Sequence, residues 1–351
     1  MKKKKIKFIV GMLLSAGVMA GVLYLNWPAI EAWMAEEEAE RQAWEVYTQK
    51  EEKTQNLTMD EAEEPGITAK QFCLDIPEGI LAEEITVSND YLTRTVRIEI
   101  PHVDDSYFQS QPLSGRSDNV AELTYAQGKE YDVIELVMDY VYELEISHDE
   151  AYYYFDFIEP QEIYDSVVVI DAGHGGRDPG ANRQGILEKD IDLAIALELK
   201  AIFDASDENI GVYYTRIDDS NPSNTQRVEL ANKSKADLFI SIHINSYKGS
   251  RDSSINGTEV MYSSTHEGEL TSKQLAEICM EELTAALESR DRGLITGDNI
   301  YIINQSEVPV ALVEIGFITN KEERELLNSK DYQKKTAEAL YEAVIRALGE
   351  Q

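Results

Sequence analysis

The sequence is poor in cysteine and in positive charge. Its 351 residues include two cysteines, Cys73 and Cys279, which lie far apart and argue against both a disulfide scaffold and a thiolate metal site. Lysine and arginine number 32 against 66 aspartates and glutamates, which gives a formal net charge of −34. This balance argues against nucleic acid as a partner and against binding of anionic lipid by the part outside a membrane. It favours an uncharged or weakly cationic partner.

Near its beginning the chain has an apolar run that is long enough to cross a bilayer. Five lysines precede this run, which has 18 residues from Phe8 to Leu25, and Tyr24 and Trp27 lie where an interfacial aromatic belt would be. We expect residues 1–27 to be a single-pass membrane anchor that leaves the lysines in the cytoplasm and the rest of the chain outside it. The alternative is a signal peptide cleaved after Ala20, although the apolar run continues past that residue.

Residues 28–66 lack any sustained apolar periodicity. From Glu31 to Glu64 there are twelve acidic and three basic residues. Such a segment buries too little apolar surface to fold by itself, so we expect a solvated acidic stalk that ends at Pro65-Gly66.

Residues 67–165 change to the alternation of apolar and polar residues that is typical of half-buried strands. Val96, Ile98 and Ile100 alternate with charged residues, and similar patterns occur at 133–138 and 152–158. We therefore expect a small β-rich domain, and its place in the chain suggests wall targeting by positional analogy alone. The tyrosines at 152–154 can be read as a sugar-stacking surface or, more commonly, as core and cross-strand residues.

Residues 166–351 alternate between strand and helix patterns, which predicts an α/β domain with a central, mostly parallel sheet flanked by helices. The expected strands are 167–171, 211–216, 236–245, 257–264, 298–304 and 309–317, and the expected helices are 189–203, 224–235, 272–289 and 331–348.

Four polar residues lie at the ends of these elements. The apolar run at 167–170 leads directly into AGHGG, whose glycines break the strand and display His174 at its carboxyl end. His243 ends another apolar stretch, and Glu314 follows four apolar residues, where a carboxylate is costly unless it is paired or metal-bound. Glu188 lies in the first turn of the next helix, where the helix dipole alone would favour it.

This set has the composition of a catalytic zinc site. Two histidines and one carboxylate hold zinc and leave a position for water, and a second carboxylate can accept a proton from that water. The spacing is not local, however, and the sequence has no HExxH motif. From the residues alone, a zinc hydrolase therefore stands beside the alternative of a turn histidine and a glutamate that only stabilises its helix.

The last half of the chain resembles the zinc-dependent N-acetylmuramoyl-L-alanine amidases of bacteria. The resemblance is carried, in this order, by VVVIDAGHGGRDPGA, ILEKDIDLAIALELK, RVELANKSKADLFISIHINS and VPVALVEIGFITNKEERELL. It implies one zinc ion per catalytic domain, held by His174, Glu188 and His243, with Glu314 as the catalytic glutamate.

The implied substrate is peptidoglycan. The resemblance implies cleavage of the amide between the lactyl group of N-acetylmuramic acid and the L-alanine of the stem peptide, by a zinc-activated water with Glu314 as general base and acid. Two alternatives stay open, which are a zinc endopeptidase acting on another cell-wall bond and a non-catalytic wall-binding regulator. A protein activator also stays open as a partner.

A few other residues of this half bear on the site. Asp192 stands where the family often has asparagine, which puts substrate fit in doubt and leaves the chemistry intact. For Arg216, Asp218 and Arg227 we expect surface ion pairs, with orientation of substrate or of groups around the metal as the alternative. Arg292 resembles a family position near the peptide-binding cleft.

Overall fold

The computed structural model describes residues 72–103, 106–110, 112–115, 118–249 and 252–349. The expected anchor and acidic stalk, residues 1–27 and 28–66, lie outside these ranges. Within the described ranges, no helix combines the length and the apolar character that a membrane crossing requires.

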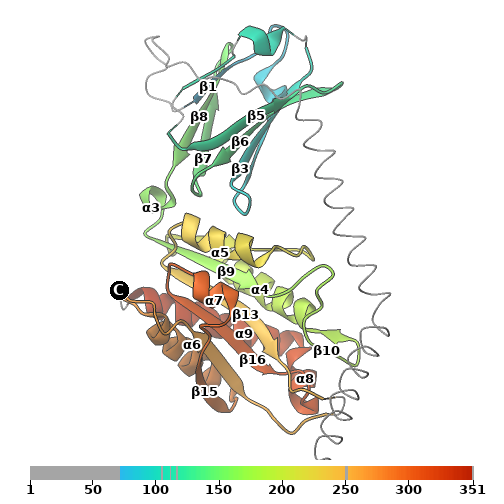
Figure 1. Cartoon of the computed structure of the whole chain (residues 1–351), viewed down its shortest axis with the longest axis vertical. Helices are drawn as coiled ribbons and strands as arrows, with labels where there is room; N and C mark the ends of the chain where they lie inside the picture. The colour runs from blue at the N-terminus through green and yellow to red at the C-terminus, as the bar shows by residue number, and fades with distance from the viewer. Residues whose placement is uncertain (1–71, 104–105, 111, 116–117, 250–251, 350–351) are drawn as a thin grey trace, which may run out of the picture. The chain divides into compact units, whose positions relative to one another are not determined.

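The first described part is a β-sandwich of two four-stranded antiparallel sheets (Figure 1). Its strands are β1 (Phe72–Asp75), β2 (Thr86–Asp90), β3 (Thr95–Pro101), β4 (Leu113–Gly115), β5 (Val120–Ala126), β6 (Tyr131–Met138), β7 (Glu143–His148) and β8 (Tyr152–Ile158). The sheet orders are β4-β1-β8-β7 and β2-β3-β6-β5. Two short 3-10 helices, η2 (Ala82–Glu84) and η3 (Tyr107–Ser110), lie in the connections.

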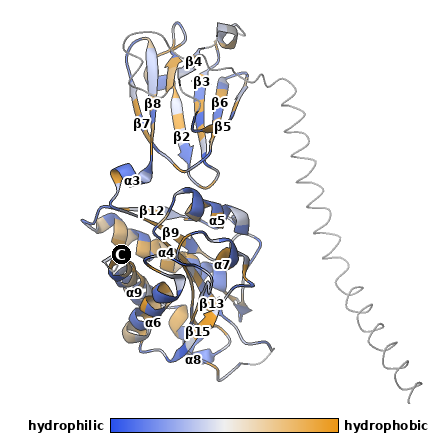
Figure 2. Cartoon of the chain, turned by 60° about the vertical axis from the view of Figure 1, so that its left-hand side comes forward, coloured by the Kyte–Doolittle hydropathy of each residue, from blue (hydrophilic) through white to orange (hydrophobic). Residues whose placement is uncertain are grey.

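Alternating side chains of the two sheets form the core of the sandwich. Val96, Ile98 and Ile100 of β3 are buried in one cluster with Phe72 and Phe155 of the other sheet. Hydrophobic and hydrophilic residues are accordingly interleaved along the strands (Figure 2). The described residues from 72 to 158 thus form the strands that the alternation predicts. The bounds of the β-rich domain and its role in wall targeting stay predictions.

The tyrosines of β8 have different environments. Tyr153 is buried and belongs to the core cluster, whereas Tyr152 and Tyr154 lie partly exposed on the other face of the strand. The hydroxyl of Tyr154 donates to Asp149. The core interpretation therefore holds for the central tyrosine of the three.

A single turn, α3 (Pro160–Ile163), leads into the α/β domain. Its six-stranded sheet consists of β9 (Ser166–Ala172), β12 (Ile210–Tyr214), β13 (Leu238–Asn245), β14 (Thr258–Tyr262), β15 (Asp291–Thr296) and β16 (Val310–Phe317), in the order β12-β9-β13-β16-β14-β15. A small hairpin of β10 (Asn182–Arg183) and β11 (Ile186–Leu187) precedes the first long helix. The helices are α4 (Glu188–Ala205), α5 (Asn224–Lys233), α6 (Ser272–Leu287), α7 (Tyr301–Gln305), α8 (Lys321–Leu327) and α9 (Lys330–Gly349).

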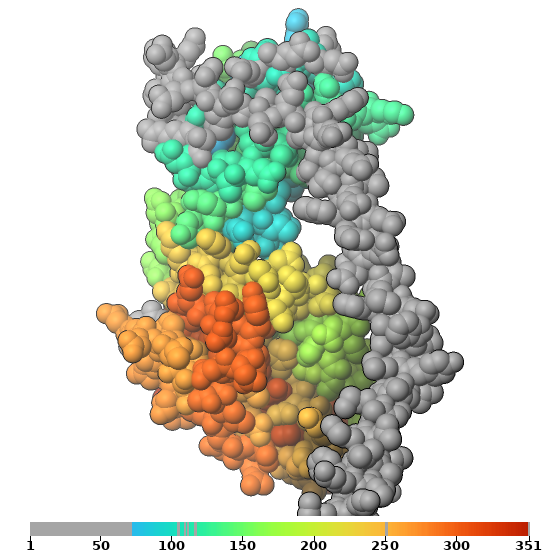
Figure 3. All heavy atoms as spheres, viewed as in Figure 1, coloured from blue at the N-terminus to red at the C-terminus, as the bar shows by residue number. Residues whose placement is uncertain are grey.

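Helices cover both faces of this sheet. Apolar residues of α4, α6 and α9 form one buried cluster with alternate residues of the central strands, such as Val168 and Ile240. The residues between them, such as Val169 and Phe239, face a second cluster that includes Val228 of α5 and Ile302 of α7. Figure 3 shows α5, in yellow, beside α7, in orange. Because both faces are buried, these strands are apolar almost throughout.

The sheet is mixed, which refines the expectation of a mostly parallel one. Strands β12, β9, β13 and β16 run parallel, whereas β14 pairs antiparallel with β16 and β15 runs parallel to β14. The expectation of a strand at 298–304 was wrong, because most of this segment lies in the helix α7. The edge strand β15 was not expected from the sequence. The apolar pattern of a segment predicts a strand but not its direction, because the direction depends on how the connecting segments lead the chain back to the sheet.

Candidate metal centre

The four candidate residues gather at the carboxyl ends of the central strands. From β9 the chain adds β12 on one side and then β13 on the other, so the strand order reverses between β9 and β13. A crevice forms at such a switch point, outside the carboxyl ends of the strands, and open α/β sheets bind ligands there. His174 follows β9 by two residues, and His243 lies near the end of β13.

The glycines around His174 have two functions that the structure makes visible. Gly173 allows close approach, because a Cβ there would lie 2.4 Å from the His243 ring. His174 itself has a φ of 55°, and Gly175 and Gly176 continue with positive φ. Left-handed backbone is unfavourable for residues other than glycine, so surrounding contacts must hold His174 in this conformation.

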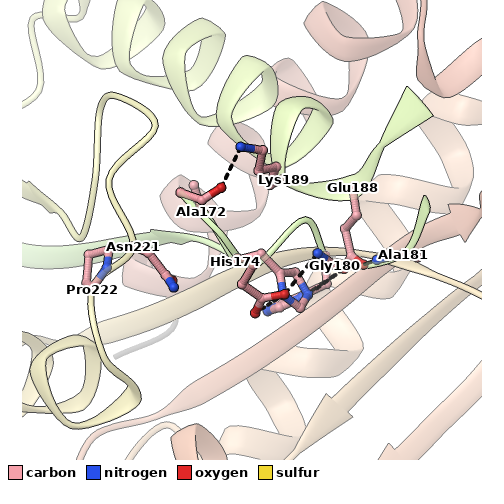
Figure 4. A network of polar contacts seen from close by, with 12 residues as sticks. Ala172, His174, Gly180, Ala181, Glu188, Lys189, Asn221 and Pro222 are labelled. Carbon is pink, nitrogen blue, oxygen red and sulfur yellow. Dashed lines mark hydrogen bonds and ion pairs between the residues drawn. The ribbon is translucent and has the colours of Figure 1, made fainter. Parts of the chain in front are cut away.

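Glu188 is the first residue of α4 and is 4% exposed. Its Oε1 lies 3.2 Å from Nε2 of His174 and 3.0 Å from Nδ1 of His243. The backbone N–H of Ala181 donates to Oε2 at 2.6 Å, and the N–H of Ile244 donates to Oε1 at 3.1 Å. Figure 4 shows Glu188 reaching from α4 toward Ala181 and His174. The backbone of a loop thus fixes one carboxylate oxygen, and the backbone of strand β13 fixes the other.

These three side chains fit a metal ion. Each offers one ligand atom, and all three atoms lie within 4.8 Å of one another. Two ligands that each lie about 2.1 Å from one tetrahedral zinc ion are about 3.4 Å apart, which is close to the separations of Glu188 from the two rings. Two further atoms at this place, Nε2 of His243 and Oε2 of Glu314, are buried without a hydrogen-bond partner among the described residues. Buried polar atoms of this kind normally have a partner.

The charges of the group are strongly coupled. Burial opposes protonation of His174, but Glu188 and Asp178 outweigh it and raise the pKa of His174 to about 9. Burial likewise opposes ionisation of Glu188, but the two histidines outweigh it and hold the pKa of its carboxyl below the usual range. Without a metal, the site therefore stabilises a cation beside an ionised carboxylate.

Glu314 lies directly beside His243. The two residues are register partners in neighbouring parallel strands, β16 and β13, and Glu259 of β14 is opposite Glu314 on its other side. Burial raises the pKa of Glu314 to about 7, and the carboxylates of Glu188 and Glu259 act in the same direction, against the opposing charge of His243. A carboxyl group with a pKa near 7 is suited to accept and return a proton at neutral pH.

One neighbour of the metal group was not anticipated from the sequence. Oδ2 of Asp178 lies 2.8 Å from Nδ1 of His174. A carboxylate on the second ring nitrogen orients a metal-binding histidine and increases its basicity. The signal was present in the sequence as an acid four residues after the histidine, but loop residues at that spacing have no fixed geometry.

The expectation for two arginines was wrong. Arg216 and Arg227 are 3% and 2% exposed, so they do not form surface ion pairs. Arg227 pairs with Asp171, which is fully buried. Both arginines also donate to backbone carbonyls of the segment that contains His174. Asp218 accepts from the backbone N–H of Ser220.

The similarity of this chain to known proteins lies in about half of its length. A family model described as N-acetylmuramoyl-L-alanine amidase matches residues 168–346. The uncharacterized protein YqiI of Bacillus subtilis (strain 168) is 39% identical over 184 residues, which are 52% of this chain and 85% of YqiI. The N-acetylmuramoyl-L-alanine amidase LytC of the same organism is 38% identical over 178 residues, which are 51% of this chain and 34% of LytC.

One solved structure is similar to about the same portion of this chain. The catalytic domain of CwlV, an N-acetylmuramoyl-L-alanine amidase from Bacillus (Paenibacillus) polymyxa var. colistinus, is 34% identical with a TM-score of 0.49. The similarity covers 53% of this chain and 99% of that domain.

Proposed function

This chain belongs to the N-acetylmuramoyl-L-alanine amidase family, and we propose that it is a zinc-dependent peptidoglycan hydrolase of the cell surface. Its substrate is the amide between the lactyl group of N-acetylmuramic acid and the L-alanine of the stem peptide. The observation that carries the proposal is the convergence of His174, Glu188 and His243 at the switch point of the sheet, with Glu314 in register beside them.

The three converging residues would hold the metal. When bound, zinc polarises a carbonyl and lowers the pKa of a water ligand toward about 7. Asp178 would hold the ring of His174 through Nδ1, and backbone N–H groups would hold both oxygens of Glu188. Glu314 would accept the proton of the attacking water and deliver it to the nitrogen of the departing L-alanine.

The charge of Glu314 depends on its neighbours. Glu259, opposite it in the sheet, accepts from Nε of Arg292 at 2.6 Å and from the amide of Asn245 at 2.7 Å. The guanidinium of Arg292 also lies over the ring of Phe317. We assign to Arg292 the role of compensating Glu259, so that Glu314 remains able to ionise near neutral pH.

Product analysis tests the reaction. The full chain is incubated with purified peptidoglycan, with and without a chelator, and the released products are identified by mass spectrometry. We expect free stem peptides that begin with L-alanine, lost on chelation and restored by zinc. Peptides that remain on the glycan while crosslinks are cut would show an endopeptidase, and zinc binding without any release would favour the non-catalytic regulator.

Glu314→Gln tests the proton transfer. The variant should bind zinc like the unsubstituted chain and release no peptide, because an amide cannot accept the proton. Glu322→Gln, at an exposed position of α8, is the matched control and should retain full release. Loss of zinc binding in Glu314→Gln would instead make Glu314 a ligand.

For the location of the enzyme we propose a membrane anchor in residues 1–27. The apolar run from Phe8 to Leu25 and the five lysines before it support this proposal. Membrane fractionation of cells that express the full chain tests it, with a form that begins at residue 28 as the control. If the full chain is expressed and the protein is found only in the culture medium, in a form that begins after Ala20, a cleaved signal peptide would be shown.

A further inference from the structure

Three consecutive carbonyls leave the sheet where β9 ends, those of Ala172, Gly173 and His174. The N–H of Gly173 still donates to Ile242 of β13, and beyond it the chain turns away in the left-handed conformation of His174. Buried carbonyls need donors. In the described residues, the donors come from two arginine side chains far along the sequence.

Arg227, on the buried face of α5, joins the strand to the loop. Its Nη1 donates to the carbonyl of Ala172 at 2.7 Å and to the carboxylate of Asp171, and its Nη2 donates to the carbonyl of His174 at 2.6 Å. Nε donates to Pro222 at 3.0 Å. The loop that carries Pro222 faces the site in Figure 4. One guanidinium thus reaches both sides of the turn at which His174 is displayed.

Asp171 fixes Arg227 from the strand side. This carboxylate is fully buried and also accepts the hydroxyls of Thr215 and Ser241, each at 2.6 Å. Arg227 and these hydroxyls outweigh the effect of burial and keep the pKa of Asp171 below its usual value. The guanidinium therefore has a charged partner that belongs to the rigid sheet.

Arg216, which follows β12, completes the set. Nε donates to the carbonyl of Ala172 at 2.9 Å, and Nη2 donates to the carbonyl of Gly173 at 2.7 Å. Nη2 also donates to the carbonyl of Lys189, directly after the ligand Glu188, at 2.9 Å. The planar fork of arginine holds such acceptors at fixed angles, which a lysine ammonium cannot do.

We propose that Arg216 and Arg227 are positioning residues for metal binding: they hold the backbone of His174 in its left-handed conformation, so that the imidazole faces Glu188 and His243. The inference rests on the proposed metal site. The metal affinity of that site then depends in part on two arginine guanidinium groups that touch neither the metal nor the substrate. Residues that orient metal ligands in this way typically change affinity by about 10- to 100-fold when they are replaced.

Zinc affinity tests the proposal. Full-length chain is stripped of metal and titrated with zinc in competition with a chromophoric chelator. Arg227→Gln should bind zinc about 10- to 100-fold more weakly than the unsubstituted chain. Arg227→Lys should be intermediate, because one ammonium group cannot reach Asp171, Ala172 and His174 together. This conservative variant also keeps the test decisive if Arg227→Gln does not fold.

Arg324→Gln is the matched control. Arg324, on α8, is 2% exposed and donates to a backbone carbonyl, that of Ile318, at 2.9 Å, and to Asp252. Its replacement should lower stability without changing zinc affinity. Equal zinc affinities in Arg227→Gln, Arg227→Lys and Arg324→Gln would overturn the proposal, since loss of a buried arginine would then act on the fold alone.

Hydrogen exchange in the metal-free chain gives a second readout. The amides of Gly175 and Asp178 bond to each other's carbonyls in the loop. These two amides should exchange faster in Arg227→Gln than in the unsubstituted chain, and their exchange rates should not change in Arg324→Gln. Equal exchange rates in the two variants would contradict the proposal. If the unsubstituted chain binds zinc but releases no stem peptide, the amidase proposal fails while this test stands. If it binds no zinc, both proposals fail.

Discussion

Replacing Gly180 by alanine tests the ligand geometry most directly. A Cβ at this position would lie 2.5 Å from Oε2 of Glu188 and 2.7 Å from Cδ2 of His174. Since real Cβ atoms do not come closer than 3.0 Å, the carboxylate oxygen must withdraw by the difference between 2.5 and 3.0 Å. That shift exceeds the tolerance of about 0.2 Å that zinc–ligand distances allow.

The carboxylate has no easy way to withdraw. Backbone N–H groups of Ala181 and Ile244 hold its two oxygens, so any displacement lengthens these hydrogen bonds. Gly180 also has a φ of 62°, and the left-handed conformation costs a residue with a Cβ about 1–2 kcal/mol. We therefore expect Gly180→Ala to lose about 1–2 kcal/mol of folding free energy. We also expect zinc affinity to fall at least about tenfold, which corresponds to about 1.4 kcal/mol.

Gly185→Ala separates these two effects. Gly185 has a φ of 81°, but a Cβ there meets no heavy atom of the described residues within 4 Å. Urea unfolding of the metal-free chain should show a loss of stability for both variants, at least as large for Gly180→Ala because the clash adds to the cost of the left-handed backbone. Chelator competition should show weakened zinc binding for Gly180→Ala alone. Equal zinc affinities in the two variants would refute the reasoning, because the clash would then have been absorbed without moving a ligand.

Two further predictions concern acids near the site. Asp178→Asn removes the charge beside Nδ1 of His174, so zinc affinity should fall by about tenfold or more, and an unchanged chelator competition would count against a role for Asp178. Asp192 is fully buried, neither carboxylate oxygen has a hydrogen-bond partner among the described residues, and burial together with the charge of Glu188 raises its pKa well above the usual value. Stability is therefore lost as pH rises from the unfolded pKa of about 3.9 toward the folded value, because the unfolded state gives up its proton first. Asp192→Asn removes this loss. In urea unfolding of the metal-free chain, the variant should exceed the unsubstituted chain in free energy of unfolding by little near pH 4 and by more at pH 7. A difference in stability that does not depend on pH would contradict this explanation.

Three of the four candidate residues stand out in the sequence because each lies at a local break in pattern, whereas Glu188 was assigned as a ligand only by the family resemblance. His174 interrupts a buried strand with glycines, and Glu314 places a charge where an apolar residue belongs. His243 ends an apolar run in the same way. Residue counting did not show that these breaks meet in space, since that depends on the order of strands in the sheet. The resemblance to a known family indicated that these residues form one site. The switch point between β9 and β13 explains physically why they lie together.

Burial of the arginines was not predictable from pattern. Arg227 lies in a helix, α5, with alternating polar and apolar residues, and Arg216 follows a strand at its exposed-looking end. Nothing local distinguishes such residues from surface cations, which are far more common. They are buried because three carbonyls at the end of β9 require donors, and that requirement appears only once the strand has neighbours. The antiparallel direction of β14 was also not predicted, because it too depends on which strands become neighbours in the sheet.

The two sides of the site therefore depend on different forces. His243 and Glu314 are set by the register of β13 against β16, so core packing beneath the sheet determines their spacing. His174 leaves the sheet with a strained backbone and depends on polar contacts that core packing cannot provide. Truncating Ile240 in the core should thus lower overall stability with the ligands still in register. Removing a polar anchor of the loop should weaken metal binding out of proportion to its effect on folding, which is the distinction that the arginine and glycine variants measure.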